Sequence, residues 1–149
     1  MLTENTSARA EGEIRALAEN WRKGFLARDL DTVMSCYTPD VVAFDAVLKL
    51  QFQGAQAYGK HWQACMEMCP GDLVCEFGEF AVEASDNLAF ARFLFRCGGT
   101  NDKGESQSSW MRSTIGLRRV GDQWKIAHEH ISMPFDPMSG KVLFDATPE

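Results

Sequence analysis

Two histidines of this sequence are the first candidates for chemistry. His128 and His130 lie two residues apart in "WKIAHEHIS", 124–132, and the chain has only three histidines. Side chains two apart on a β-strand lie on the same face, so both rings are expected on one side of a sheet. Imidazole has the unperturbed pKa closest to neutral, which suits proton transfer. We therefore predict that His128 is a general acid or base and that His130 holds a substrate oxygen beside it.

Asp45 is the second candidate, because it interrupts the apolar run "VVAFDAVL", 41–48. Buried carboxylates are rare unless they are paired, so an unpaired Asp45 would reach solvent at the strand end or cap a turn. The functional alternative places Asp45 in a pocket, as a second acid or base or as the group that orients the His128 ring.

These three side chains would also suit a metal ion. Two imidazoles and one carboxylate are the ligand set of some iron and zinc sites, provided that Asp45 comes within bonding distance of both rings. This interpretation is kept as an alternative. We expect no cofactor, since the sequence has neither a dinucleotide fingerprint nor a phosphate loop.

The first half of the chain is expected to be mainly helical. Apolar residues at spacings of three and four predict an amphipathic helix over 8–28. A short helix capped by Asp29 or Asp31 should follow and end at Pro39. A strand over 41–48 then precedes a helix over 54–69, which Pro70 terminates.

The second half reads as four strands. "LVCEFGEFAVEA" and "LAFARFLFRC" are separated by turn residues 85–87, and "SQSSWMRSTIGLRRV" and "WKIAHEHISM" by Gly121 and Asp122. Segregated helices followed by an antiparallel meander predict an α+β fold, in which the sheet curls around the N-terminal helices.

The last hairpin predicts which residues share a face. A two-residue loop at 121–122 places Val120 opposite Gln123. Counting outward, the residues that should face the helices are His128 with Ile115, His130 with Ser113, and Ser132 with Met111. The opposite face would carry Trp110, Arg112, Thr114, Gly116, Ala127, Glu129 and Ile131.

Composition limits the class of protein. The 149 residues, 45% of them hydrophobic, suit one domain over 1–149 with a tail at 134–149. A formal net charge of −6 argues against nucleic acid or an anionic membrane as a partner. The N-terminal segment has no apolar run typical of export, and the five cysteines form an odd set, so we expect a cytoplasmic protein with free thiols.

Two segments resemble a known family. "NWRKGFLARDLDTVMSCYTPDVVAFDAVLKLQFQG" and "GLRRVGDQWKIAHEHIS" are similar to the SnoaL-like and ketosteroid-isomerase-like branch of the nuclear transport factor two superfamily. The resemblance runs from Glu19 to Pro134. It implies a strongly curved, cone-shaped sheet wrapped around helices, with a deep apolar pocket that opens at one end.

The resemblance also suggests roles for particular residues. In ketosteroid isomerase the proton-shuttling base is an aspartate in the first strand, and Asp45 matches that position. The tyrosine and protonated aspartate of its oxyanion hole fall here at Trp21 and Ile115. An indole N–H can still donate one hydrogen bond. The resemblance implies no metal, and it does not fix the activity, because this fold hosts many functions.

We therefore predict a cofactor-independent acid–base enzyme, an isomerase or a lyase such as a dehydratase or cyclase. Its substrate would be a small, largely apolar carbonyl or hydroxy compound. The alternative is a non-catalytic ligand-binding or dimerisation module with the same fold. Besides Asp45 and His128, the predicted pocket residues are His130, Ser132, Trp21, Phe44, His61, Trp62, Met111, Ser113 and Ile115.

A homodimer through the outer sheet face is also expected. That face mixes aromatic, small and charged residues, a composition typical of interfaces. Arg112 and Glu129 would pair across the twofold axis. The alternative is a monomer whose outer face is covered by the tail residues Val142, Leu143 and Phe144.

Overall fold

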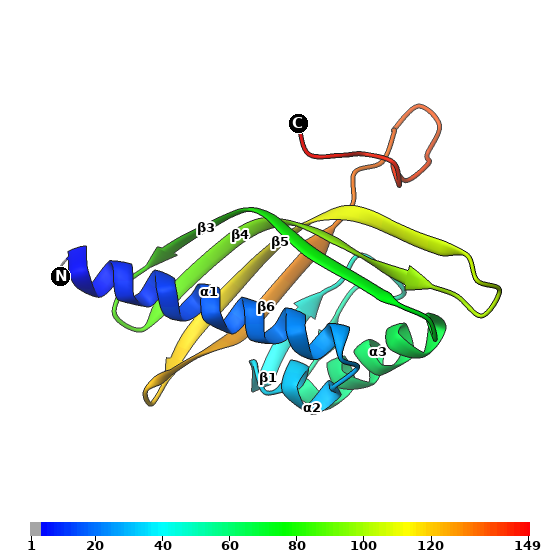
Figure 1. Cartoon of the computed structure of the whole chain (residues 1–149). Coiled ribbons are helices and arrows are strands. Elements are labelled where there is room, and N and C mark those ends of the chain that lie inside the picture. The colour runs from blue at the N-terminus through cyan, green and yellow to red at the C-terminus, as the bar shows by residue number, and fades with distance from the viewer. Residues whose placement is uncertain (1–3) are drawn as a thin grey trace.

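Three helices lie against one side of a curved sheet (Figure 1). The computed structural model describes residues 4–149. Residues 1–3 lie outside the described residues. They begin the N-terminal segment that we interpret as lacking an export signal.

The helices follow the predicted order. They are α1 (Glu4–Leu26), α2 (Leu30–Met34) and α3 (Ala55–Met68). Asp29 is the N-cap of α2, and its side chain accepts a hydrogen bond of 3.2 Å from the Thr32 backbone N–H. The predicted end of this helix at Pro39 is wrong, because the chain is already extended from Tyr37 onward.

The strands form one mixed sheet that is not closed. Their bounds are β1 (Tyr37–Phe44), β2 (Phe52–Gln53), β3 (Leu73–Ala84), β4 (Leu88–Thr100), β5 (Ser106–Val120) and β6 (Gln123–Ser132). The strand order is β2-β1-β6-β5-β4-β3, and β1 pairs with β6 in parallel while the other neighbours are antiparallel. The predicted α+β class with a mostly antiparallel sheet is confirmed.

A β-bulge in β6 changes the predicted register. Val120 pairs with Gln123 and Leu117 with Ile126, as expected, but the next pair joins Gly116 to His128. Ala127 is the extra residue. A one-residue shift moves every later side chain to the other face of a strand.

The inward placement of both histidines is therefore wrong. Glu129 and Ile131 are buried at 5% and 4% exposure, whereas His130 is exposed and His128 is half-buried on the outer face. Ser132 also lies on that face, where its hydroxyl accepts a hydrogen bond of 3.1 Å from Arg112 Nε. The prediction for β5 is correct at Ser113 and Ile115, which are both buried.

Phe44 accompanies the histidines outside the core. Val42 and Phe44 of β1 pair with His128 and His130. Phe44 is 38% exposed, and its ring packs edge-on against both imidazoles, with centroid distances of 4.8 and 5.5 Å. Phe44 was predicted to line the pocket, but like the two histidines it lies on the outer face of the sheet.

Arg28 holds the C-terminal end of α3 in place. This residue has a φ of 60°, at the turn between α1 and α2. Its guanidinium donates to the carbonyl oxygens of Met66, at 2.8 Å, and of Cys69 and Gly71. The last carbonyls of a helix have no partners within it, so these bonds fix α3 against the end of α1.

The C-terminal residues leave the sheet after β6. Phe135 and Val142 form an isolated antiparallel bridge, and the segment projects from the sheet in Figure 1. Phe135, Met138 and Phe144 are all at least 60% exposed. Among residues 4–149, none of the helices has the length and apolar character needed to cross a bilayer.

Candidate functional site

An apolar cavity lies between α1, α3 and the inner face of the sheet. Its free volume is about 20 Å³, which is room for about one water molecule. Among the described residues that line it, Glu129 is the only ionisable one and Ser113 the only one with an aliphatic hydroxyl. The lining consists of Ala18, Trp21, Trp62, Phe77, Phe93, Phe95, Ser113, Ile115, Ile126, Glu129 and Ile131.

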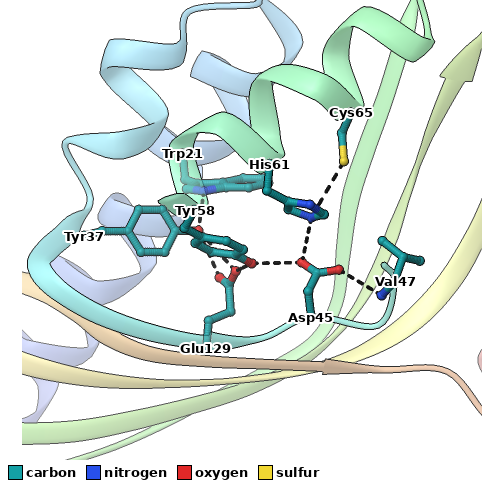
Figure 2. Close-up of polar contacts among 8 residues, drawn as sticks. All are labelled: Trp21, Tyr37, Asp45, Val47, Tyr58, His61, Cys65 and Glu129. Atoms are coloured by element: carbon teal, nitrogen blue, oxygen red, sulfur yellow. Dashed lines mark hydrogen bonds and ion pairs between the residues drawn. The ribbon is translucent and has the colours of Figure 1, made fainter. Parts of the chain in front are cut away.

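Two tyrosines hold the Glu129 carboxyl. The Tyr37 hydroxyl lies 3.1 and 3.2 Å from its two oxygens, and the Tyr58 hydroxyl contacts Oε2 (Figure 2). Trp21 Nε1 donates in turn to the Tyr37 hydroxyl at 2.9 Å. Burial raises the pKa of both phenols well above their ordinary value, so they remain protonated donors.

The same environment changes the ionisation of Glu129. Burial, reinforced by the nearby charge of Asp45, raises its pKa to about 7, against the hydrogen bonds from Tyr58 and Tyr37. A carboxyl with this pKa exchanges protons readily near neutral pH. Glu129 therefore has the proton affinity that we had expected of a histidine.

Asp45 is held at the end of β1 by three neighbours. Its carboxylate accepts from the Tyr58 hydroxyl at 3.0 Å and from the Val47 backbone N–H at 3.3 Å, and it lies 3.2 Å from His61 Nε2. The Asp45 and His61 side chains are 6% and 1% exposed. Burial disfavours the imidazolium, but the bonds to Asp45 and Cys65 outweigh it and raise the pKa of His61 to about 9.

Counting hydrogens links these groups into one chain. The Tyr58 hydroxyl has one proton, yet its oxygen contacts a carboxyl on each side. A proton on Glu129 completes the chain, because Glu129 then donates to Tyr58, and Tyr58 donates to Asp45. His61 donates to Asp45 from the other end. Figure 2 shows these side chains converging from β6, α3 and the end of β1.

A second, open hollow begins where this chain ends. Asp45 and His61 line a cleft of about 350 Å³ that also includes Cys65 and Met111. Val47, Met68 and Phe144 line it as well, and they are 45%, 69% and 60% exposed. The Glu129 end of the hydrogen-bond chain thus faces the inner cavity, and the His61 end faces the open cleft.

The predicted site residues fall into two groups. Residues on the inner side that line the cavity or the cleft are Trp21, Asp45, His61, Trp62, Met111, Ser113 and Ile115. Those on the outer side are Phe44, His128, His130 and Ser132. His128 Nδ1 lies 2.7 Å from the Val42 carbonyl oxygen, so the ring hydrogen-bonds to the backbone of the neighbouring strand β1.

The metal alternative fails on the same geometry. Asp45 belongs to the inner network and both histidines to the outer face, so the three groups do not surround one point. Within residues 4–149, no group of three or more His, Cys, Asp or Glu side chains is placed to hold a metal ion.

The sequence analysis missed Glu129, Tyr37 and Tyr58. Tyr58 had a signal, because Tyr58, His61, Trp62 and Cys65 have the i, i+3, i+4, i+7 spacing of one helix face. Tyr37 was assigned to the short helix before it. Glu129 had no local signal, since strict alternation from the hairpin places it outside.

Comparison with known proteins agrees with this architecture. Curved sheets covered by helices on one face define the NTF2-like class of folds, and several solved structures of that class superpose on this one. A family model for the SnoaL-like domain matches residues 14–136, so the chain belongs to the SnoaL-like family. No curated protein matches the chain significantly.

Three solved structures illustrate the likeness. An NTF2-like protein of unknown function from Pseudomonas putida KT2440 is 46% identical, with a TM-score of 0.87, covering 95% of this chain and 99% of that one. A ketosteroid isomerase-like protein from Erwinia carotovora atroseptica is 22% identical, with a TM-score of 0.68 and coverages of 81% and 93%. A scytalone dehydratase-like protein from Novosphingobium aromaticivorans is 11% identical, with a TM-score of 0.74 and coverages of 83% and 83%.

Proposed function

We propose that this protein catalyses proton transfer on a small, largely apolar carbonyl or hydroxy compound, with Glu129 as the acid–base group. The observation that carries the proposal is a buried carboxyl with a pKa of about 7 in the wall of an apolar cavity. Isomerisation and dehydration are the reaction types suggested by the names of two structural relatives. Either reaction needs one proton acceptor whose conjugate acid returns the proton.

The chemistry follows from the two forms of Glu129. The carboxylate removes a proton from the carbon beside the substrate carbonyl, and the resulting acid returns it. Return to another carbon gives an isomer, whereas return to a departing hydroxyl gives an unsaturated product and water. Tyr37 and Tyr58 fix the orientation of the carboxyl, so it is already positioned for proton transfer.

The hydrogen-bond chain provides a route for this proton to leave the closed cavity. From Glu129 it can pass through the Tyr58 hydroxyl to Asp45, which is paired with His61 in the open cleft. This assigns Asp45 and His61 a proton-conducting role. It replaces the direct role that the sequence suggested for His128.

The proposal can be tested before the substrate is known. The protein is incubated in D2O with 2-tetralone, 1-indanone and 3-cyclohexen-1-one, and exchange at the carbon beside the carbonyl is followed by NMR. We expect enzyme-dependent exchange of at least one ketone, and Glu129→Gln should slow it by about 100-fold or more. The rate should rise with pH through about 7, as Glu129 ionises.

A matched variant controls for loss of a carboxylate elsewhere. Glu76 is paired with Arg96 outside the cavity, so Glu76→Gln should keep the wild-type exchange rate. Full exchange by a folded Glu129→Gln variant would show that Glu129 is not the base.

One observation favours the alternative of a non-catalytic binding module. Tyr37 contacts both carboxyl oxygens of Glu129 and Tyr58 contacts one, so this buried network is satisfied without a ligand. A binding module predicts that ketones shift protein NMR signals around the cavity while no exchange occurs with any of them. The same experiment therefore separates the two functions.

We further propose that two copies pair through the outer face of β4, β5 and β6. This face presents half-buried Trp110 and Leu94 and the 46% exposed Phe90, with Arg92 and Arg112 between them. Aromatic and arginine side chains are typical of protein interfaces. The predicted pairing of Arg112 with Glu129 across a twofold axis is wrong, because Glu129 points into the molecule.

A further inference from the structure

One thiol in the wall of the open cleft has an imidazole beside it. Cys65 is half-buried on α3 and lines the cleft. Its Sγ lies 3.7 Å from Nε2 of His61, one helical turn earlier, and the same nitrogen lies 3.2 Å from Asp45 Oδ2 (Figure 2). A nucleophile in contact with an imidazole that a third group holds in place is the arrangement of activated side chains in enzymes. Cys65 is therefore a candidate nucleophile that proton transfer by Glu129 does not use.

His61 carries a positive charge next to this sulfur. Burial lowers the pKa of its imidazole, but the bonds to Asp45 and Cys65 outweigh burial and raise the pKa to about 9. The ring is therefore protonated at neutral pH, and Nε2 has one hydrogen within reach of both neighbours. Nδ1 is buried without a hydrogen-bond partner. Because a thiolate is the reactive form of cysteine and a neighbouring imidazolium stabilises it, His61 is the group that would activate Cys65.

The other four thiols are placed differently. Burial raises the pKa of Cys36, raises that of Cys75 to about 12, and raises that of Cys97 well above its ordinary value. These three thiols therefore remain protonated and unreactive at neutral pH. Cys69 is half-buried and lines the cleft as Cys65 does, but in the described part of the chain its sulfur makes no hydrogen bond to a histidine. It serves as a matched control, four residues away on the same wall.

The cleft indicates which electrophiles would reach Cys65. Most of its lining is apolar, as at Phe25, Leu73 and Met111, so it favours uncharged, largely apolar molecules. Sulfur is a soft, polarisable nucleophile, and it prefers a carbon of similar character, such as the β carbon of a C=C bond conjugated to a carbonyl. A molecule of this class is also what the proposed dehydration would produce.

We propose that Cys65, paired with His61, is a nucleophile for α,β-unsaturated carbonyl compounds that enter the open cleft. The sulfur bonds to the β carbon, the electron pair of the C=C bond moves to the carbonyl oxygen as an enolate, and water protonates the α carbon. The thiol proton passes to the solvent, so the product is a thioether and no oxidant or reductant takes part. The addition requires neither Glu129 nor turnover, so its failure is separate from failure of the proposed acid–base function.

Peptide mapping of the wild-type protein tests the site. The protein is incubated with 2-cyclohexen-1-one, borohydride then reduces the carbonyl of the adduct so that it survives digestion, and mass spectrometry follows the adduct at each cysteine. We expect Cys65 to react about tenfold or more faster than Cys69, the effect of one neighbouring opposite charge. A first adduct at another cysteine, a rate at Cys65 no higher than that at Cys69, or no adduct at all would each overturn the proposal.

Two variants separate activation by His61 from simple exposure of the thiol. His61→Gln removes the charge but keeps a polar side chain, so it should slow the adduct at Cys65 by about tenfold or more and leave that at Cys69 unchanged. Cys69→Ser should keep the wild-type rate at Cys65. An unchanged rate at Cys65 in His61→Gln, once circular dichroism has shown that this variant is folded, would overturn the pairing. If His61→Gln does not fold, the comparison of Cys65 with Cys69 in wild type still decides.

Discussion

At the scale of single residues, the buried carboxyl of Glu129 couples folding to pH. Its pKa is about 7 in the folded protein against an ordinary value of 4.5, so the folded state binds this proton more tightly than the unfolded chain. A raised acid pKa makes the contribution of the group to stability fall as pH rises from 4.5 to 7. The loss of stability is complete about one pH unit above this pKa.

This coupling gives a prediction for Glu129→Gln, which removes the titration but keeps the shape. Between pH 5 and pH 8 the free energy of unfolding of wild type should fall relative to the variant by about 2.5 kcal/mol. Urea unfolding at several pH values measures it. Parallel pH curves for the two proteins would contradict the raised pKa.

Tyr58 controls the same group from α3. Its hydroxyl lies between the Asp45 and Glu129 carboxyls, and its bond with Glu129 lowers the pKa of Glu129. Tyr58→Phe should therefore raise that pKa further and destabilise the protein by about 1–3 kcal/mol, because Asp45 loses a buried donor and Glu129 loses a hydrogen-bond partner. Carbon-13 NMR titration of the glutamate side chains follows the pKa.

Tyr37→Phe is the matched control for Tyr58→Phe. It removes the same hydroxyl, but Tyr37 contacts Glu129 and not Asp45. We expect a smaller rise in the pKa of Glu129, because the bond from Tyr58 has the stronger effect on it. A larger rise in the pKa of Glu129 in Tyr37→Phe than in Tyr58→Phe would contradict this prediction.

At the scale of elements, the close approach of β4 and β5 depends on one glycine. A Cβ at Gly98 would lie 2.0 Å from the Gln107 carbonyl oxygen and 2.6 Å from the Ser108 Cα. Both are backbone atoms of the neighbouring strand, so the strands would have to separate. Gly98→Ala should lower the free energy of unfolding by about 2 kcal/mol or more.

Gly12→Ala tests the opposite case. Gly12 is exposed within α1, and a Cβ there meets nothing within 4 Å. Because alanine favours a helix interior over glycine, this variant should be stabilised by up to about 1 kcal/mol. Thermal unfolding of both variants beside wild type compares them, and equal effects would show that the strand contact is not limiting.

At the scale of the whole molecule, the proposed dimer makes the outer face of the sheet an interface. Sedimentation at micromolar concentration should give twice the chain mass of 16.7 kDa. Trp110→Glu places a charge in the apolar part of this face and should yield monomers. A monomeric wild type would exclude the dimer, and a dimeric Trp110→Glu variant would exclude this face.

Val120→Glu controls for the charge itself. Val120 is 50% exposed at the end of β5, beside the turn into β6, so a glutamate there should leave the dimer intact. The tail alternative is testable in parallel, because Val142, Leu143 and Phe144 remain 40–60% exposed and Phe144 lies in the cleft wall. If the tail does not cover the interface, a protein lacking residues 135–149 should still sediment with twice the mass of its own chain.

The sequence by itself determined the order of the helices and the four long strands, and several of the residues on the inner face of the sheet. Apolar spacing predicted the long helices, and the turn residues predicted the hairpins, because these signals arise from contacts between residues near in the chain. The same local reasoning placed Ser113 and Ile115 inward on β5, since their pairing starts at the tight turn of 121–122. Asp45 stood out because one carboxylate interrupts an apolar run.

Only the tertiary structure decided which side chain of β6 enters the cavity. The bulge at Ala127 adds one residue where β6 meets both β5 and β1, and β1 has its own irregularity between Tyr37 and Val42. That irregularity depends on how three strands fit together, so alternation along one strand does not reveal it. It exchanges His128 for Glu129, and it brings Glu129 to tyrosines from elements about 70 and 90 residues away in the chain.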